Sequence, residues 1–291
     1  MSDDRHTLRS ARIGATILAH GAELCSLKTA EGLELLWQAG PEWPRHAPLL
    51  FPIIGEVRNE QIRVRGKLYR MQRHGVARDH DFAWVERSPQ SCKLLQTDTA
   101  KTRAHFPFAY RLILSYALRG ADLEITIAIA NPGDDVLPCS IGAHPALRWP
   151  LLPGLPKEDY RLTFSHDEPA PIRRLSKDGL LLPDPRPSPI QGRVLSLSKR
   201  LFDEDAVILD HLASRSVRYA ADKGPALEVS WDGFGQLGIW SKPDDAPFLC
   251  IEPWHGFASP VGFDGEFTDK PGLMHIPPGD AREFRYTIGV R

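Results

Sequence analysis

The chain has 291 residues, 42% of them hydrophobic and 25% charged, a composition typical of a globular protein. Its 36 basic and 37 acidic residues leave a formal net charge of −1, which argues against a nucleic-acid-binding surface or a basic membrane-binding patch. No apolar run approaches the roughly 20 residues of a membrane-spanning helix, and residues 1–6 lack the basic start and apolar core of a signal peptide.

The clearest predicted elements are two strands joined by a tight turn. Apolar and polar residues alternate over 112–118 and again over 122–130, and this period of two places every other side chain on one face of a strand. The linking residues Arg119-Gly120-Ala121-Asp122 have the length and the glycine of a tight turn. We therefore predict a β-hairpin in this part of the chain.

The second half of the chain contains a predicted loop, a short helix and two further strands. Proline occupies every second position from 183 to 189, which favours an extended surface loop over a recognition motif. Residues 198–205 have a briefly helical pattern, and alternation returns at 227–231 and 284–290. The last two runs predict strands.

Proline and glycine mark many turns between these runs. The chain has 26 prolines and 23 glycines, too many for a helical protein and natural for a β-protein with many turns. Neither a linker nor an internal repeat stands out. We predict an all-β protein, a single large antiparallel β-sandwich domain over residues 1–291 with few short helices, whose first ten or so residues are a candidate flexible segment.

The four cysteines, Cys25, Cys92, Cys139 and Cys250, lie far apart and form no CxxC pair. Such sparse cysteines suit a reducing compartment, where they serve as small buried hydrophobes. We therefore expect a cytoplasmic protein that has neither nucleic acid nor a membrane as its partner. The sequence leaves the oligomeric state open.

Candidate functional residues lie in three short segments, residues 73–79, 141–146 and 249–256. In the last of them, Glu252 follows an apolar run and precedes Pro253, which cannot donate to a sheet ladder, so we expect the strand to end there. A carboxylate in such an apolar place has a raised pKa and suits a general base. A buried glutamate that anchors an arginine is the alternative.

The other two segments carry histidines. His144 is followed by Pro145, which favours an extended backbone, and its imidazole could act as an acid near neutral pH. A histidine hydrogen-bonded within a packed turn is the alternative. His74 and Arg78 could hold sugar hydroxyls, or they could belong to a solvated loop with a salt bridge to Asp79.

Metal binding is a rival explanation of the same residues. None of the 11 histidines forms an HxH or HExxH spacing, so His74, His144 and His255 could converge only through the fold. A serine hydrolase is disfavoured because the G-x-S-x-G elbow is missing. Nucleotide binding is disfavoured because both G-x-G-x-x-G and G-K-[ST] are missing. We expect neither a metal nor another cofactor.

In combination and in order, these segments resemble the aldose 1-epimerase family, also called galactose mutarotase-like. The branch most resembled is bacterial and consists of unassigned homologues found with lactose and tagatose operons. The resemblance extends from about residue 12 to 290. The matching stretches are 48–55 with "P-x-L-F-P-x-x-G", 74–78 with "H-G-F-A-R", 142–145 with "G-x-H-P", 201–206 with "L-F-x-x-D-A", and 252–253 with "E-P".

The resemblance implies a β-supersandwich whose concave face binds a small-molecule sugar. It implies that an acid and a base on opposite sides of the sugar open and close the ring, without a metal or redox cofactor. The implied residues are Glu252 as catalytic base, His144 as catalytic acid, His74 and Asp205 as ligands of sugar hydroxyls, and Arg58 as a substrate-binding arginine. Trp254 and His255 could support the pyranose ring or the base, and packing is the alternative for both.

One departure and one alternative accompany this resemblance. Val76 replaces the usual aromatic residue of "H-G-F-A-R", which would reshape one wall of the site. A related branch acts on hexose 6-phosphates and holds the phosphate with arginines, whose planar fork suits that group. Arg78 matches one such arginine, and Arg45 lies near the position of another.

The sequence therefore predicts an isomerase, a carbohydrate mutarotase that interconverts the α and β anomers of an aldose. The alternatives are a hexose-6-phosphate mutarotase and a non-catalytic sugar-binding or regulatory protein on the same fold, because fold alone does not determine function. A metal-dependent isomerase of cupin type is a more remote alternative. The sequence does not identify the sugar.

Overall fold

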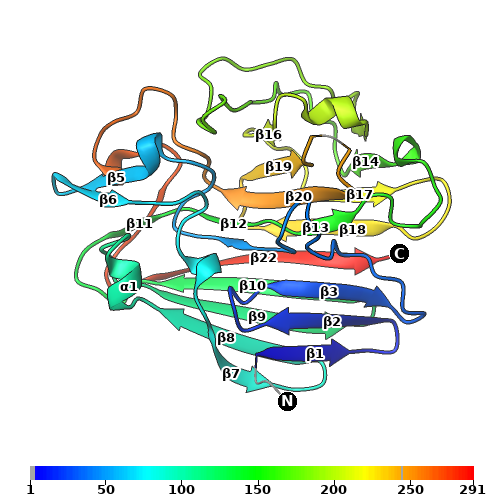
Figure 1. Ribbon diagram of the computed structural model, residues 1–291, viewed down its shortest axis with the longest axis horizontal. Coiled ribbons are helices and arrows are strands. Elements are labelled where there is room, and N and C mark those ends of the chain that lie inside the picture. Colours follow the sequence, from blue (N-terminus) through cyan, green and yellow to red (C-terminus); the bar gives the residue numbers. More distant parts are fainter. Residues whose placement is uncertain (1–3, 244) are drawn as a thin grey trace.

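The computed structural model describes residues 4–243 and 245–291. Its largest sheet is antiparallel and has nine strands, which extend from the bottom of Figure 1 to its upper right. In spatial order the strands are β15 (Val194–Ser196), β14 (Arg161–Phe164), β17 (Ser216–Ala220), β18 (Leu227–Asp232), β22 (Ala281–Val290), β10 (Asp122–Ala130), β9 (Arg111–Arg119), β8 (Ser91–Thr97) and β7 (Ala83–Arg87).

A second antiparallel sheet, in the upper part of Figure 1, carries most of the candidate functional residues. In spatial order its strands are β16 (Val207–Leu209), β19 (Gln236–Trp240), β20 (Phe248–His255), β12 (Ile141–Ala143) and β4 (Leu49–Leu50), and β13 (Ala146–Arg148) pairs with β20 beside β12. Strand β20 is buried along seven of its eight residues. Leu249 and Ile251 belong to the main hydrophobic core, whereas Phe248 and Cys250 belong to a second buried cluster with Trp37.

Three smaller sheets complete the architecture of the described residues. A three-stranded sheet lies across β8 and β9 in Figure 1 and consists of β1 (Arg5–Arg9), β2 (Ile13–Leu18) and β3 (Leu24–Thr29). Two hairpin-sized sheets consist of β5 (Gln61–Val64) with β6 (Lys67–Arg70), and β11 (Leu137–Cys139) with β21 (Met274–Ile276). Part of the segment considered for flexibility is therefore strand β1, while residues 1–3 lie outside the described residues.

The predicted hairpin and the two predicted later strands are confirmed. β9 and β10 pair in full register, with Tyr116 opposite Ile125, and both side chains are buried. Removing a side chain of this size from water contributes about 1.5–3 kcal/mol to the stability of the fold. The buried face of the hairpin therefore requires apolar residues at every second position, and this requirement produces the alternating pattern in the sequence. The hydroxyl of Tyr116 also donates to Ala22 O at 2.6 Å, and this bond ties the nine-stranded sheet to the loop between β2 and β3.

Helices are few and short, as predicted. The described residues contain one α-helix, α1 (Ala100–Arg103), which Thr99 caps through a capping box with Thr102. The 3₁₀ helices are η1 (Arg58–Glu60), η2 (Ala77–Asp79), η3 (Lys157–Asp159), η4 (Lys199–Phe202) and η5 (Phe267–Asp269). None of these helices is long and apolar enough to cross a membrane.

The other local predictions have mixed outcomes. The helical pattern at 198–205 corresponds to the 3₁₀ helix η4. The proline-rich stretch 183–189 is a loop with one isolated bridge, between Arg186 and Ile172. All-β antiparallel architecture is confirmed, whereas a single domain over residues 1–291 stays a prediction.

The expectation that a strand ends at Glu252 is wrong, because β20 continues to His255. On one side β20 pairs with β19 without interruption, including Leu237 opposite Pro253. On the other side its pairing with β12 stops at Trp254, and its pairing with β13 begins at Cys250. Pro253 therefore falls in a gap of the ladder, where a missing N–H leaves no partner unsatisfied.

Candidate active site

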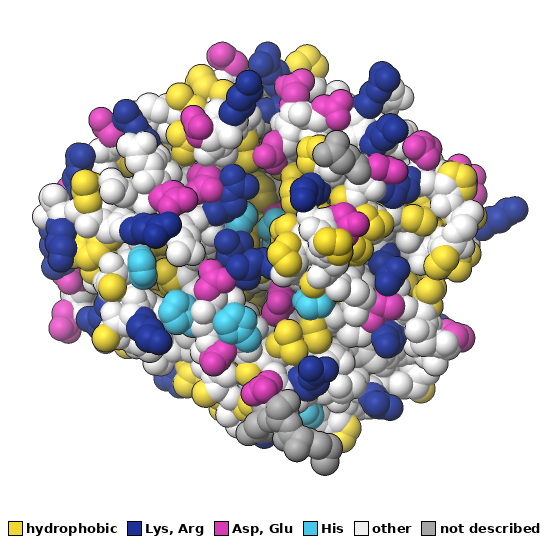
Figure 2. Space-filling model, in the orientation of Figure 1, with side chains coloured by type: hydrophobic (Ala, Val, Ile, Leu, Met, Phe, Trp, Pro, Cys, Tyr) yellow, Lys and Arg dark blue, Asp and Glu magenta, His cyan; other side chains and the backbone are white. Residues whose placement is uncertain are grey.

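A cavity of about 200 Å³ opens over the second sheet and collects most of the predicted site residues. Figure 2 shows a hollow near the middle of this face, with basic and acidic side chains around it and histidine side chains in it. The residues predicted from the sequence that line the cavity are His74, Arg78, His144, Asp205, Glu252 and Trp254.

Strand β20 and the break between β12 and β13 build the floor of this cavity. Glu252 and Trp254 are two residues apart in β20 and therefore project from the same face. Gly142 of β12 pairs with Trp254, and Ala146 of β13 pairs with Cys250. His144 is midway between these two pairs, so it lies directly across from Glu252.

His144 and Glu252 are in direct contact. His144 Nε2 lies 3.2 Å from Glu252 Oε2, and both side chains are almost fully buried. This contact is not a hydrogen bond, because Oε2 of Glu252 has no hydrogen-bond partner among the described residues. The other ring nitrogen of His144, Nδ1, has none either. The family resemblance implies an acid and a base on opposite sides of the sugar. In the structure the two groups instead face one another, and their unsatisfied polar atoms lie next to the cavity.

The environment shifts the pKa values of both groups toward their neutral forms. Burial raises the pKa of Glu252 well above its ordinary value, with the Trp254 side chain opposing and Asp205 adding to the rise. Burial, followed by the charge of Arg78, lowers the pKa of His144 to about 3. An ion pair would shift both values the other way, but two buried charges without a hydrogen bond between them cost more than their attraction returns. We therefore assign a carboxylic acid next to a neutral imidazole.

His74 reaches the cavity from a tight turn before η2. Its φ is 65°, a left-handed conformation that histidine adopts more readily than most residues. Gly75 follows with φ of 79°, and a Cβ there would lie 2.2 Å from Phe51 O, so only glycine fits. His74 Nδ1 accepts a hydrogen bond from Gly55 N–H at 3.1 Å, which leaves the proton of the neutral ring on Nε2 as a donor. Burial lowers the pKa of His74 well below its ordinary value.

Asp205 is the second site residue with a left-handed backbone, with φ of 63°. Such a conformation costs about 1–3 kcal/mol and occurs often at ligand-binding sites. Oδ1 of Asp205 accepts from the N–H of Ala206 at 2.6 Å. Arg174 supports the turn, since its guanidinium donates to Asp205 O at 2.7 Å and to Leu201 O at 3.1 Å.

Three arginines border the cavity. All three have a carboxylate nearby, because Arg78 Nε lies 3.7 Å from Asp79 Oδ2, which is the salt bridge considered as an alternative for this segment. Arg45 donates to Asp79 Oδ1 at 2.7 Å, and Arg73 donates to Glu56 Oε1 at 2.6 Å. Arg78 donates to Arg73 O at 2.7 Å, while its Nε is buried without a hydrogen-bond partner among the described residues. Burial, followed by the charge of Arg45, lowers the pKa of Arg78 to about 10. The wall formed by these side chains therefore has positive potential.

Two expectations about site residues do not match the geometry. Arg58 does not line the cavity, because the chain turns away after Gly55 and passes into η1, where the half-exposed Arg58 side chain lies 3.7 Å from Asp264. His255 projects from the other face of β20 than Glu252, and its ring packs against Phe284 at 5.5 Å. The three histidines considered as metal ligands therefore do not converge, although the rings of His74 and His144 lie 5.5 Å apart.

Two tryptophans that are not among the residues predicted from the sequence enclose His144. Trp43 stacks on the imidazole with ring centroids 4.9 Å apart, and Trp240 meets it edge-on at 5.7 Å. Trp43 lies in a loop, and the residues that its indole contacts are distant in the sequence. No periodic pattern could therefore predict its place beside His144. A tryptophan between glycine and prolines at 40–44 was the one available signal.

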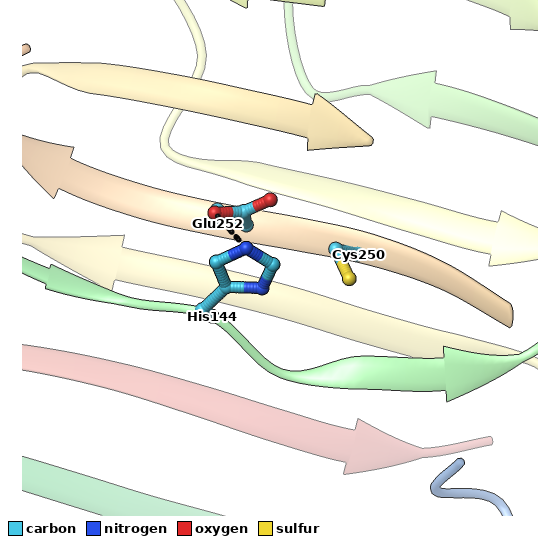
Figure 3. A group of neighbouring side chains, drawn as sticks. All are labelled: His144, Cys250 and Glu252. Carbon is cyan, nitrogen blue, oxygen red and sulfur yellow. Dashed lines mark ion pairs between the residues drawn. The ribbon is translucent and has the colours of Figure 1, made fainter. Parts of the chain in front are cut away.

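The donor atoms of three neighbouring side chains could also hold a metal ion. They belong to His144, Cys250 and Glu252, and the ligand atoms lie within 4.8 Å of one another (Figure 3). Cys250 was expected to be a small buried hydrophobe, and it is fully buried. Its place two residues before Glu252 puts it on the same face of β20.

Comparison with known proteins gives a consistent result. The family model described as aldose 1-epimerase matches residues 4–273. Two proteins of Lactococcus lactis subsp. lactis, called protein LacX, plasmid, and protein LacX, chromosomal, are each 34% identical to the chain over 285 residues, which is 93% of this chain and 94% of theirs.

Solved structures agree with the sequence comparison. A galactose mutarotase related enzyme from Lactobacillus acidophilus is 31% identical, with a TM-score of 0.91 over 99% of this chain and 97% of its own. A galactose mutarotase-like protein from Lactobacillus casei is 29% identical, with a TM-score of 0.92 over 99% of this chain and 100% of its own. The resemblance stated from the sequence motifs is thereby confirmed.

Proposed function

The chain belongs to the aldose 1-epimerase family, and we propose that it is a mutarotase, an isomerase that interconverts the α and β anomers of an aldose. In this proposal Glu252 is the base and His144 is the acid. The observation that carries it is the contact of these two buried side chains at 3.2 Å, on the floor of a cavity and with polar atoms left unsatisfied.

The pair contains the one proton that the reaction requires. In the neutral state this proton is on the carboxyl group of Glu252, and the ring nitrogen of His144 that faces Glu252, Nε2, has no proton. Transfer of this proton to His144 produces a carboxylate base and an imidazolium acid without any exchange with solvent. A sugar hydroxyl that donates to Glu252 stabilises the carboxylate and favours this transfer.

The steps then balance without any further reactant. The carboxylate of Glu252 removes the proton from the anomeric O1 hydroxyl, the C1–O5 bond breaks as the C1 carbonyl forms, and His144 donates its proton to O5. Rotation about C1–C2 presents the other carbonyl face, and the same steps in reverse close the ring. Because O1 and O5 are both bonded to C1, an acid and a base that lie close together can serve both oxygens. Each typically contributes about 10²–10⁴-fold.

The remaining cavity residues have roles that fit a sugar. His74 offers a donor at Nε2, Asp205 offers acceptors, and Trp254 and Trp43 offer flat apolar surfaces to the C–H faces of the ring. The cavity volume of about 200 Å³ is below the roughly 300–1,000 Å³ of sites for drug-sized ligands. This size favours one monosaccharide unit over an oligosaccharide.

A hexose 6-phosphate is the second candidate substrate, and the arginine wall favours it. Arg45, Arg73 and Arg78 line the cavity, whereas only Arg45 and Arg73 have a carboxylate within hydrogen-bonding distance. Guanidinium groups bind phosphate in bidentate geometry. Arg78 is the arginine best placed for such a contact, since its buried Nε has no hydrogen-bond partner among the described residues.

Two-dimensional NMR exchange spectroscopy tests the proposal. We expect the protein to accelerate exchange between α and β anomers for one member of a panel of free aldoses and their 6-phosphates, and we expect Glu252→Gln to lose this acceleration. A folded protein that binds a sugar without accelerating exchange would instead be a non-catalytic sugar-binding protein. A cytoplasmic location completes the proposal and is motivated by the four cysteines, which are all free thiols.

A further inference from the structure

A thiol that the proposed reaction does not use lies next to the cavity floor, beside His144 and Glu252. Cys250 and Glu252 project from the same face of β20, and His144 lies across the gap from them. Figure 3 shows the carboxylate above the imidazole and the thiol to one side of it, both on the same strand. One nitrogen, one sulfur and one oxygen therefore meet in a buried place, within 4.8 Å of one another.

These distances are close to those of a tetrahedral metal site. Zinc binds nitrogen and oxygen at about 2.0–2.2 Å and sulfur at about 2.3 Å, which puts tetrahedral ligands about 3.4–3.6 Å apart. His144 Nε2 and Glu252 Oε2 are already 3.2 Å apart. With one donor atom taken from each of the three side chains, no separation exceeds 4.8 Å, so side-chain movements of about 1 Å complete the triangle.

A second observation indicates that this place lacks a ligand. Oε2 of Glu252 is buried and has no hydrogen-bond partner among the described residues. A buried oxygen left in this way costs about 1–3 kcal/mol. Coordination to a cation would satisfy it.

We propose that His144, Cys250 and Glu252 form a binding site for a thiophilic divalent cation such as Zn²⁺, with the fourth position open to the cavity. Three protein ligands and one open position are the arrangement of zinc sites that exchange a ligand. The bound ion occupies the lone pairs of the acid and the base together, so it inhibits any reaction that uses them. The ligand set excludes Mg²⁺ and Ca²⁺, which prefer oxygen ligands alone.

The charges around this site are compatible with a bound cation, despite the three arginines in the cavity wall. A thiolate and a carboxylate together balance a divalent cation, so the complex adds no net charge to the cavity. Asp79 and Glu56 are hydrogen-bonded to Arg45 and Arg73 and offset those two positive charges. Arg78 remains as the opposing charge, with its nearest carboxylate at 3.7 Å, and it weakens binding without abolishing it.

Titration of the full-length protein with Co²⁺, as a spectroscopic probe for Zn²⁺, tests the site directly. We expect one equivalent to bind with a thiolate-to-cobalt charge-transfer absorption. We expect Cys250→Ser to lose this absorption and to bind at least about tenfold more weakly. Cys25→Ser, which removes the most exposed thiol, is the matched control and should behave as wild type. No such absorption in wild type, or its persistence in Cys250→Ser, overturns the proposal.

Two further measurements support this titration, and the first of them needs no variant. In wild type, one equivalent of Zn²⁺ should shift the ¹⁵N resonances of the His144 ring, and unchanged resonances would contradict coordination. Zn²⁺ should also slow anomer exchange at least about tenfold in wild type, with recovery on chelation, and much less in Cys250→Ser. Equal inhibition in both proteins would place the ion elsewhere. The cobalt and nitrogen signals do not depend on catalysis, so a failure of the proposed function is distinguishable from a failure of this site.

Discussion

Gly238 of β19 and Trp254 of β20 fit together so closely that a Cβ on Gly238 would lie 2.4 Å from Cζ2 of the indole. On the opposite side, a Cβ on Gly142 of β12 would lie 2.6 Å from Cδ1 of the same ring. The indole therefore lies between two glycines of neighbouring strands. The two glycines therefore leave room for a tryptophan two residues after Glu252 on the same face of β20.

Gly238→Ala should therefore displace Trp254. We expect a loss of about 1–3 kcal/mol in the free energy of unfolding, the usual cost of overpacking, and a fall in anomer exchange. Chemical denaturation and NMR exchange measure the two effects. Gly235→Ala is the control, because a Cβ there meets nothing within 4 Å. If both variants behave alike, Trp254 does not depend on the glycine.

Glu252→Gln should abolish most of the activity and change the pH dependence of stability. We expect anomer exchange to fall about 10²–10⁴-fold. Burial raises the pKa of Glu252 in the folded state, so wild type gains stability from the bound proton below pH about 4.5 and loses it as pH rises toward the folded pKa. Glutamine has no proton to lose, so the difference in melting temperature between variant and wild type should grow in favour of the variant from pH 5 to 9. A constant difference would contradict the raised pKa.

The loss of stability at acidic pH should depend on His144, whose pKa is shifted in the opposite direction to that of Glu252. The pKa of His144 is lowered to about 3 in the folded protein. Between pH about 6.5 and about 3, the unfolded chain therefore binds a proton at His144 that the folded chain does not bind. Wild type therefore loses stability on acidification from pH 6.5. We expect His144→Gln to show a shallower loss between pH 6.5 and 4.5 in thermal denaturation. Parallel curves for the two proteins would show that the imidazole is protonated in the folded state.

Features with a local cause could be predicted from the sequence. The β9–β10 hairpin could be predicted because alternate side chains over 112–130 enter one core, and burial of that face requires apolar residues at period two. The pairing of Glu252 with His144 as candidate residues came from the family motifs. Neither residue alone has a pattern that distinguishes catalysis from packing.

Features that depend on distant contacts could not be predicted. The continuation of β20 through Pro253 depends on a gap between β12 and β13, more than 100 positions earlier in the sequence. The approach of Cys250 to His144 has the same origin. The position of Arg58 could not be predicted because the chain turns at Gly55, which has a left-handed φ of 64°, and passes away from the cavity before it reaches Arg58. Spacing along the chain does not reveal that direction.

Substitution of Arg78 should separate charged from neutral sugars. If Arg78 binds a phosphate, Arg78→Gln should weaken a hexose 6-phosphate at least about tenfold while changing a free aldose by about twofold or less, since a charge-assisted hydrogen bond contributes about 1.5–3 kcal/mol. Isothermal calorimetry with both sugars measures the difference. Arg58→Gln is the control, because Arg58 lies outside the cavity, and it should affect neither ligand. Equal losses for both sugars would exclude a phosphate contact at Arg78.

Arg174 should act as a positioning residue for Asp205. Its guanidinium donates to Asp205 O at 2.7 Å and to Leu201 O at 3.1 Å, and so it holds a turn in which Asp205 has a left-handed backbone. Loss of this support frees the turn to relax, which moves the carboxylate away from the cavity. We expect Arg174→Gln to raise KM about tenfold with kcat changed by about threefold or less, because about 1.4 kcal/mol of binding free energy corresponds to a factor of ten.

Two comparisons separate positioning by Arg174 from a general loosening of the loop. Arg173→Gln removes the neighbouring arginine, which pairs with Asp210 at 3.0 Å instead, and it should leave KM nearly unchanged. In an Asp205→Asn background, Arg174→Gln should add little further loss, because residues that act through one another are not additive. Arg174→Lys should recover part of the effect, since one ammonium can reach one of the two carbonyls. An equal rise of KM in Arg173→Gln, or full additivity with Asp205→Asn, would show that Arg174 stabilises the loop without positioning Asp205.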